Sequence, residues 1–134
     1  MNLPKINKNT ASNKPDGTVG AKSLVEDWFS KWQSGDFLNL PVSGGFRHTS
    51  PFGTIVSKEA YLELVRKNKD KFLNHKFDVH DGIYEKDRVC VRYTAIQDDF
   101  NLDVSEWYYI RDGLIDEIVA YYHIGEIRED RKLK

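Results

Sequence analysis

The sequence predicts an α+β domain in which helices come first and antiparallel strands follow. Apolar residues recur at helical spacing over Leu24–Trp32 and again over Ala60–Phe72. After residue 74 the apolar spacing changes to two, which is typical of strands with one buried face. Asp112-Gly113 lies between two such segments and is a strong signal for a two-residue hairpin. Helices followed by a meander of strands are the pattern of an α+β fold.

Each predicted element has a boundary signal of its own. Gly35 ends the first helix, and Asp36 starts a short second helix that Pro41 ends. Ser57 is an N-cap for a helix that runs to about Lys71. The predicted strands are a short one over Phe46–Ser50 and four longer ones over 74–85, 88–97, 102–111 and 114–123.

Length and composition fit a single domain with polar ends. The chain has 134 residues, of which 40% are apolar, and 20 Lys and Arg balance 21 Asp and Glu. Residues 1–20 have almost no apolar side chains, so we expect a flexible tail there. Residues 129–134 form a charged end. We therefore expect one folded domain over residues 21–128.

Composition also narrows the classes of partner and cofactor. A net charge near zero argues against a nucleic-acid or anionic-membrane partner, and no stretch approaches the roughly 20 apolar residues of a membrane span. Cys90 is the single cysteine, which excludes a disulfide framework and a multi-cysteine metal site. The sequence contains no phosphate-binding glycine loop, so a cofactor is not indicated. Without the apolar stretch of a secretory signal, we expect a cytoplasmic protein that needs neither a cofactor nor a metal.

The predicted strand over residues 102–111 carries large side chains on both faces. Glu106 shares one face with Val104 and Tyr108, whereas Trp107 and Tyr109 point to the other. Two helices cannot cover both faces of a sheet. We therefore predict a homodimer that buries Trp107 and Tyr109 through the outer sheet face.

Two ionisable residues stand out because they lie among apolar ones. An unpaired carboxylate at Glu106 would be costly to bury, so it must be paired, neutralised or solvated by a pocket. It is either a pocket group or half of a structural ion pair. His48 shares a strand face with Phe46 and Ser50 and is a general base, a hydrogen-bond donor to a ligand, or a satisfied core group.

Three segments in this order resemble the nuclear transport factor 2-like superfamily: Trp28–Asp36, Thr49–Gly53 and Trp107–Ile115. The branch they are most similar to is that of SnoaL-like polyketide cyclases and ketosteroid isomerases, and the resemblance covers Ala21–Arg128. It implies a cone-shaped fold in which N-terminal helices and a curved, mainly antiparallel sheet enclose one apolar pocket, usually in a homodimer. It does not imply one reaction, because this fold hosts several activities and also non-catalytic proteins.

The family's functional positions carry over only in part. The tyrosine, the aspartate base and the protonated aspartate of ketosteroid isomerase fall on Trp28, Ser50 and Glu106, so two of the three roles are lost. Ordinary ketosteroid isomerase chemistry is therefore not expected. Asp112–Glu117 resembles a motif of the SnoaL-like branch. The aspartate that often closes the last strand in that branch falls on His123, which can also exchange protons.

The resemblance and the residues together predict acid–base chemistry on a small hydrophobic carbonyl compound, as an isomerase, cyclase or dehydratase without a cofactor. Glu106 and His48 would move protons, and His123 or a tyrosine would polarise the carbonyl oxygen. The sequence leaves open a non-catalytic binding module for a hydrophobic metabolite and a ligand-free dimerisation domain. The expected ligand-binding residues are Trp28, Trp32, Ser50, Phe52, Tyr108 and Tyr122.

Overall fold

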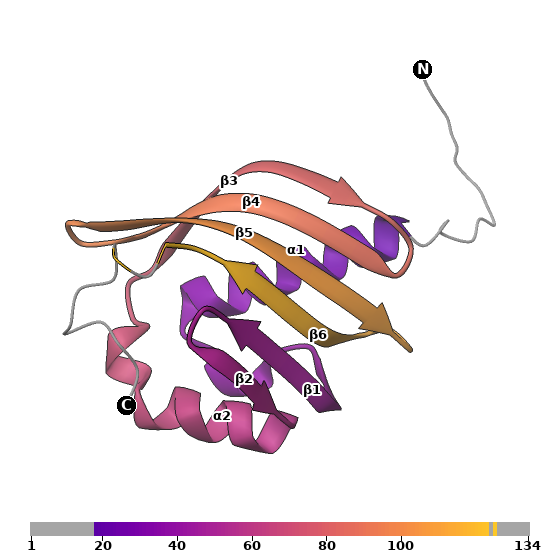
Figure 1. The fold of residues 1–134 in the computed structure, drawn as a ribbon, viewed down its shortest axis with the longest axis horizontal. Helices are drawn as coiled ribbons and strands as arrows, with labels where there is room; N and C mark the ends of the chain where they lie inside the picture. The colour runs from indigo at the N-terminus through magenta and orange to yellow at the C-terminus, as the bar shows by residue number, and fades with distance from the viewer. Residues whose placement is uncertain (1–17, 124, 126–134) are drawn as a thin grey trace.

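The computed structural model describes residues 18–123 and residue 125 (Figure 1). The expected tail over residues 1–17 and the charged end over 129–134 lie outside these described residues. The helical elements are α1 (Thr18–Ser34), η1 (Phe37–Asn39), α2 (Lys58–Lys67) and η2 (Lys69–Lys71). The strands are β1 (Val42–Ser50), β2 (Gly53–Val56), β3 (Lys76–Tyr84), β4 (Arg88–Gln97), β5 (Phe100–Arg111) and β6 (Leu114–Tyr121).

The strands form one curved, mixed sheet in the order β2-β1-β6-β5-β4-β3 (Figure 1). Only the β1–β6 pair is parallel among the described strands, and every other neighbouring pair is antiparallel. The two long helices lie on the same side of this sheet: α1 packs on β3 and β4, and α2 packs on β1 and β2. The α+β prediction, with helices against a curved and mainly antiparallel sheet, is confirmed.

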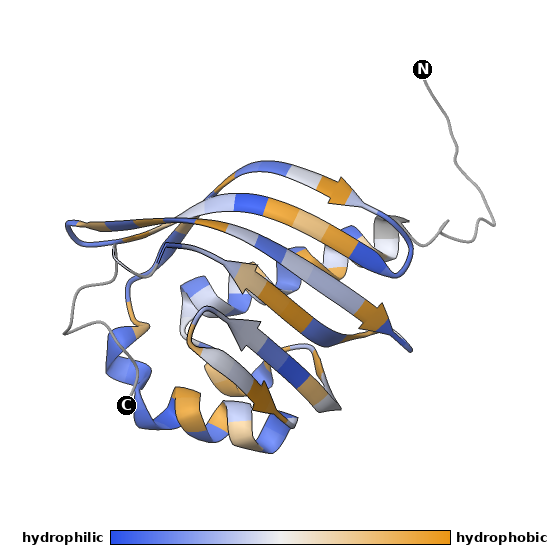
Figure 2. Cartoon of the chain, viewed as in Figure 1, coloured by the Kyte–Doolittle hydropathy of each residue, from blue (hydrophilic) through white to orange (hydrophobic). Residues whose placement is uncertain are grey.

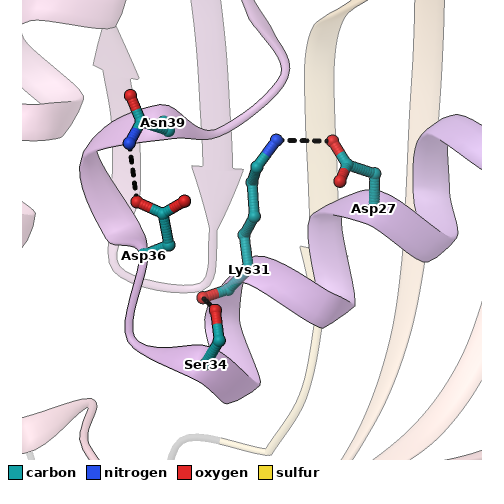
Figure 3. A network of polar contacts seen from close by, with 5 residues as sticks. All are labelled: Asp27, Lys31, Ser34, Asp36 and Asn39. Atoms are coloured by element: carbon teal, nitrogen blue, oxygen red, sulfur yellow. Dashed lines mark hydrogen bonds and ion pairs between the residues drawn. The ribbon is translucent and has the colours of Figure 1, made fainter.

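The end of α1 shows how local sequence sets the path of the chain (Figure 3). Gly35 has a φ of 83°, and the Asp36 amide donates to the Lys31 carbonyl over 2.9 Å, which is a Schellman C-cap. The Ser34 hydroxyl donates to that same carbonyl over 3.2 Å. Asn39 then donates to the Asp36 carboxylate over 2.6 Å. These contacts turn the chain so that Phe37 of η1 is buried.

Several element boundaries differ from the predicted ones. The first helix starts at Thr18, inside the segment predicted as a tail. The helix capped by Ser57 ends at Lys67, because the Asn68 side chain donates to the Leu64 carbonyl over 2.9 Å and competes with helix continuation. The Ser57 cap itself is confirmed, since its hydroxyl accepts from the Ala60 amide over 3.1 Å. Strand β2 was not predicted, because a turn signal immediately precedes its four residues.

Bulges and a tight turn shape the centre of the sheet. Asp112 and Gly113 have φ of 52° and 77°, as a type I′ hairpin requires, so the predicted turn is confirmed. Strand β1 begins at Val42 rather than at Phe46, with a register shift against β6 between Val42 and Arg47. A second shift in β5–β6 follows Tyr109. Such bulges increase strand curvature and re-aim side chains.

The core lies between the helices and the inner sheet face. Phe46, Tyr108, Ile115 and Ile118 have 0% relative exposure, and α1 adds its predicted apolar stripe to them. Along β4, hydrophobic residues lie between hydrophilic ones (Figure 2). None of the helices over the described residues is long and apolar enough to cross a membrane.

The outer sheet face carries an apolar row that no described helix covers. Register places Ile83, Cys90, Trp107 and Val119 side by side across β3, β4, β5 and β6. Ile83 is 69% exposed and Tyr109, on the same face, is 37% exposed. A homodimer through this face stays a prediction, for which this exposed row is the physical reason.

Candidate functional site

A cavity of about 600 Å³ lies between the helices and the inner sheet face. Its walls are mostly apolar and aromatic, and Trp28 and Trp32 of α1 are among them, as expected from the sequence. Polar side chains from β1, β2, α2, β4 and β5 interrupt these walls, and Lys71, His75 and Tyr122 also line the cavity. A largely apolar cavity with few polar groups is the usual form of a small-molecule site.

Glu106 of β5 lines this cavity and is only 4% exposed. Its Oε1 atom accepts hydrogen bonds from the hydroxyls of Tyr93, over 3.1 Å, and Tyr108. Burial raises the pKa of Glu106 to about 7, because the charged form loses its hydration, although both hydrogen bonds lower that pKa. Near neutral pH this carboxyl is therefore divided between its acid and its carboxylate form.

His48 of β1 lines the same cavity. Burial lowers its pKa to about 4, so the imidazole is neutral at neutral pH. Its ring lies 5.1 Å from the Tyr61 ring at an interplanar angle of 31°. No residue of the described part hydrogen-bonds its ring nitrogens, so one N–H donor and one acceptor are available to a ligand.

Tyr61 of α2 is a third polar group of the cavity and was missed by the sequence analysis. It is 6% exposed, and its hydroxyl has no hydrogen-bond partner among the described residues. Burial raises the pKa of Tyr61, and the nearby Glu106 charge raises it further. Tyr61 therefore contacts His48 and also lies close enough to Glu106 for the carboxylate charge to raise the pKa of its phenol. An apolar helix face that includes one tyrosine reads as core in a sequence, which is why the phenol was overlooked.

Sheet register relates Glu106 to His48. Glu106 pairs with Ala120 of β6, and His48 pairs with Ile118 of the same strand. Because β6 lies between β1 and β5, the two backbones are separated by about 10 Å. Both side chains project into the cavity from opposite sides of β6, which leaves room for part of a ligand between them.

Ser50, Phe52 and Tyr122 also line the cavity, as the sequence analysis expected. Ser50 hydrogen-bonds the Tyr122 phenol, and its Oγ accepts from the Phe52 amide over 3.2 Å. The rings of Phe52 and Tyr122 lie 6.1 Å apart, and Phe52 is 54% exposed. Because its hydroxyl already makes both of these hydrogen bonds, Ser50 forms part of the cavity wall.

Two expected site residues do not line the cavity. Tyr108 is fully buried behind Glu106 and contacts Trp28 and Phe29, so it reaches a ligand only through Glu106. His123 is exposed, and its Nδ1 accepts from the Gly125 amide over 3.1 Å. Strand β6 ends at Tyr121, so strand alternation no longer directs the side chain of His123.

The described residues contain no cluster of three or more His, Cys, Asp or Glu side chains that could hold a metal ion. The cavity's ionisable groups come from separate elements, and His48 and Glu106 are set apart by the width of β6. Glu106, His48 and Tyr61 together offer one poised carboxyl and two hydrogen-bonding groups in a largely apolar cavity.

Comparison with known proteins identifies the fold. The sequence matches no family model and no curated protein. An NTF2-like protein of unknown function from Cytophaga hutchinsonii is 20% identical, with a TM-score of 0.66 over 77% of this chain and 89% of that chain. A SnoaL-like protein of unknown function from Burkholderia thailandensis is 17% identical, with a TM-score of 0.68 over 82% and 99%. An LEH-like epoxide hydrolase from M. tuberculosis is 17% identical, with a TM-score of 0.69 over 81% and 86%.

Other similar structures are provisionally described as a ketosteroid isomerase and as polyketide cyclases. At these identities the comparisons define the fold. The chain has the nuclear transport factor 2-like fold, so the resemblance found in the sequence is confirmed at that level. Which chemistry the cavity supports must come from its own residues.

Proposed function

We propose that this protein is a cofactor-independent acid–base enzyme that acts on a small hydrophobic carbonyl compound. The observation that carries the proposal is the Glu106 carboxyl, which is buried in an apolar cavity with a pKa raised to about 7. A general base or acid works best when its pKa lies near the working pH. A carboxyl serving only as a structural partner would be expected to pair with a cation, whereas the hydrogen bonds of Glu106 come from phenols.

The reaction begins when the carboxylate form of Glu106 removes a proton from the carbon next to the carbonyl group. The C–H bond breaks, an O–H bond forms on Glu106, and the electron pair moves to the carbonyl oxygen to give an enolate. In a β,γ-unsaturated carbonyl compound the enolate is conjugated with the double bond, and return of the same proton to the γ carbon isomerises the compound to its α,β-unsaturated form. Expulsion of a β-hydroxyl group dehydrates the compound when the Glu106 proton passes to that group, which leaves as water. Attack of the enolate carbon on a second carbonyl group closes a ring, and the alkoxide formed there takes the Glu106 proton.

Tyr61 and His48 supply the hydrogen bonds that the enolate oxygen requires. Tyr61 has a hydroxyl without a partner in the described part of the chain, and its raised pKa keeps the proton in place. His48 stays neutral, so its role is that of an N–H donor; this replaces the proton-moving role that the sequence suggested. Donors fixed at the site of developing charge are a large source of rate acceleration.

The names of the structural neighbours support a small-molecule enzyme of this kind. They include a hydrolase acting on epoxides and provisional isomerase and cyclase descriptions. Of these, isomerisation and cyclisation proceed through the enolate that Glu106, Tyr61 and His48 can form and hold. No arginine is found among the described residues that line the cavity, so an arginine-assisted opening of an epoxide is not part of this proposal.

Exchange of α-protons with solvent tests the proposal without knowledge of the natural substrate. 2-Tetralone, a small bicyclic ketone, is incubated with the protein in D2O, and loss of its α-proton signals is followed by NMR. We expect Glu106→Gln to reduce the enzyme-dependent exchange rate by about 100-fold or more, and Tyr61→Phe to reduce it less. Glu117→Gln is the matched control, because this glutamate lies on the outer sheet face opposite Tyr109.

Two results would contradict the proposal. If the ketone raises the thermal stability of the protein but exchanges no faster than with Glu106→Gln, the cavity binds without catalysis, as a binding module would. If a panel of cyclic and aromatic ketones neither binds nor exchanges, carbonyl chemistry is wrong for this cavity.

A further inference from the structure

The Glu106 carboxyl is held asymmetrically. Tyr93, from β4, and Tyr108, from β5, both donate to its Oε1 atom. No hydrogen bond to Oε2 comes from any residue of the described part, although Glu106 is 4% exposed and lines the cavity. A buried carboxylate ordinarily spreads its hydrogen bonds over both oxygens, which have several acceptor sites in total. Here one oxygen takes both donors and the other is left to whatever occupies the cavity.

We infer that Tyr93 and Tyr108 are positioning residues that fix Oε1, so that Oε2 is the oxygen of Glu106 that exchanges a proton with a ligand. This inference rests on the proposed function for its catalytic meaning, but the geometry it describes can be measured without turnover. It also gives Tyr108, which cannot touch a ligand, a defined part in the site.

The hydrogen bonds of Glu106 explain why the proton of its acid form is held on Oε2. A carboxylic acid has one O–H donor, and a proton placed on Oε1 would face two phenol groups that already donate to that atom. To accept it, a phenol would have to turn its own O–H away from Oε1. Tyr108 is fully buried, and Tyr93, which lines the cavity, would have to direct its O–H into a largely apolar space. A proton on Oε2 disturbs neither bond. The acid form therefore has Oε1 as its carbonyl oxygen and Oε2–H directed to the cavity.

The two phenols also keep the carboxylate form within reach. Hydrogen bonds to an ionised acceptor are stronger than those to a neutral one. Tyr93 and Tyr108 therefore lower the pKa of Glu106 and oppose the effect of burial. Without them the carboxyl would be almost wholly protonated at neutral pH and could not act as a base. Because both are locked by packing, in contacts such as that between the rings of Phe29 and Tyr93 at 5.0 Å, the carboxyl is also fixed in direction.

The test is a titration of Glu106 in the intact protein labelled with [5-13C]glutamate, with Glu106→Gln used to assign its carboxyl signal. We expect Tyr93→Phe and Tyr108→Phe each to move the midpoint of this titration to higher pH by about one pH unit. Tyr122→Phe is the matched control: its phenol lines the same cavity and is hydrogen-bonded to Ser50 rather than to Glu106. This control should leave the midpoint unchanged.

Infrared difference spectra of the protonated protein identify the oxygen. The carbonyl stretch of the Glu106 acid should shift to higher frequency in Tyr93→Phe, because Oε1 then loses a hydrogen bond. The same shift is expected in Tyr108→Phe, and Tyr93→Phe keeps the test usable should the fully buried Tyr108 prove necessary for folding. In the exchange assay, the pH profile should move upward with the titration midpoint.

Equal midpoints and equal carbonyl frequencies in wild type, Tyr93→Phe and Tyr122→Phe would overturn the inference. Such a result would leave the proposed function to be judged by α-proton exchange alone. Conversely, shifted midpoints together with no exchange in the wild type would support the asymmetric carboxyl and contradict the enzyme. The two ideas therefore fail in distinguishable ways.

Discussion

Glu106 and His48 are expected to impose opposite pH dependences on the stability of the fold. Burial raises the pKa of Glu106 from 4.5 to about 7 and lowers that of His48 from 6.5 to about 4. Below pH 4.5 Glu106 is protonated in both folded and unfolded chains and does not lower the unfolding free energy. As the pH rises from 4.5 to 7, only the unfolded chain ionises freely, so stability is lost and stays lost above pH 7.

The size of the Glu106 effect follows from its two pKa values. A difference of about 2.5 corresponds to about 3 kcal/mol of unfolding free energy. His48 acts in the opposite sense: its contribution is complete above pH 6.5 and is lost as the pH falls toward 4. Because the His48 ring is partly exposed, we expect a smaller magnitude there. Between pH 4.5 and 6.5 the two effects partly cancel in the wild type.

Single substitutions separate the two effects. Glu106→Gln keeps the shape of the side chain and removes its ionisation. The unfolding free energy of this variant minus that of the wild type should therefore increase by about 3 kcal/mol from pH 4.5 to pH 8. His48→Gln removes the opposing effect, so its unfolding free energy should fall relative to that of the wild type as the pH rises from 4 to 6.5, and the difference should stay constant above pH 6.5. Urea unfolding, followed by the fluorescence of buried Trp28 and Trp32, gives these free energies at each pH.

All other titrating groups are shared by the wild type and each variant, so the difference between two curves isolates one residue. A difference between Glu106→Gln and wild type that is constant from pH 4.5 to 8 would show that Glu106 has an ordinary pKa. That result would remove the basis for both the stability prediction and the proposed general base.

Two further predictions concern the sheet. In light scattering, the wild type should have the mass of a dimer and Trp107→Glu the mass of a monomer, because this substitution places a charge in the apolar row of the outer sheet face. A wild type that is monomeric at high micromolar concentration would refute the dimer. Gly113→Ala should lower the unfolding free energy in urea by about 1 kcal/mol, because Gly113 has a φ of 77°, whereas Gly44→Ala, at a position with open space and no positive φ, should change it little. Equal losses in the two glycine variants would contradict that reasoning.

The inward position of Glu106 could be predicted from the sequence because strand alternation is unbroken over the relevant part of β5. Its register shift comes only after Tyr109, so the side chains from Leu102 to Tyr108 keep their phase. In β6 the phase is broken instead: Ile115 and Ile118 are both fully buried although they are three residues apart. A bulge of this kind has no distinct sequence signal here, so alternation was a poor guide to His123, beyond the strand's end.

The partners of Glu106 illustrate a different limit. Tyr93 looks like one more inward residue of β4, and nothing in its own neighbourhood indicates a polar role. A signal did exist, because a two-residue turn at Asp98-Asp99 pairs Gln97 with Phe100 and thereby places Tyr93 diagonally from Glu106. Tyr61 gave no comparable signal. Its approach to His48 depends on how α2 packs on β1, which only the tertiary structure reveals.

The charge states of Glu106 and His48 favour a neutral ligand group between these two side chains. Had His48 been an imidazolium, its positive charge would have favoured the Glu106 carboxylate and lowered the pKa of that carboxyl. Instead burial dominates both groups, which leaves a neutral imidazole and a carboxyl balanced near pH 7. In the proposed reaction, proton removal from a neutral carbonyl compound protonates Glu106 and moves the negative charge to the enolate oxygen. The total charge of the cavity does not change during this step, so no new burial penalty arises, and the N–H of His48 and the O–H of Tyr61 stabilise the charge at its new position. An anionic group placed beside Glu106 would add its charge to that of the carboxylate and further raise the carboxyl's pKa, which would suppress the base.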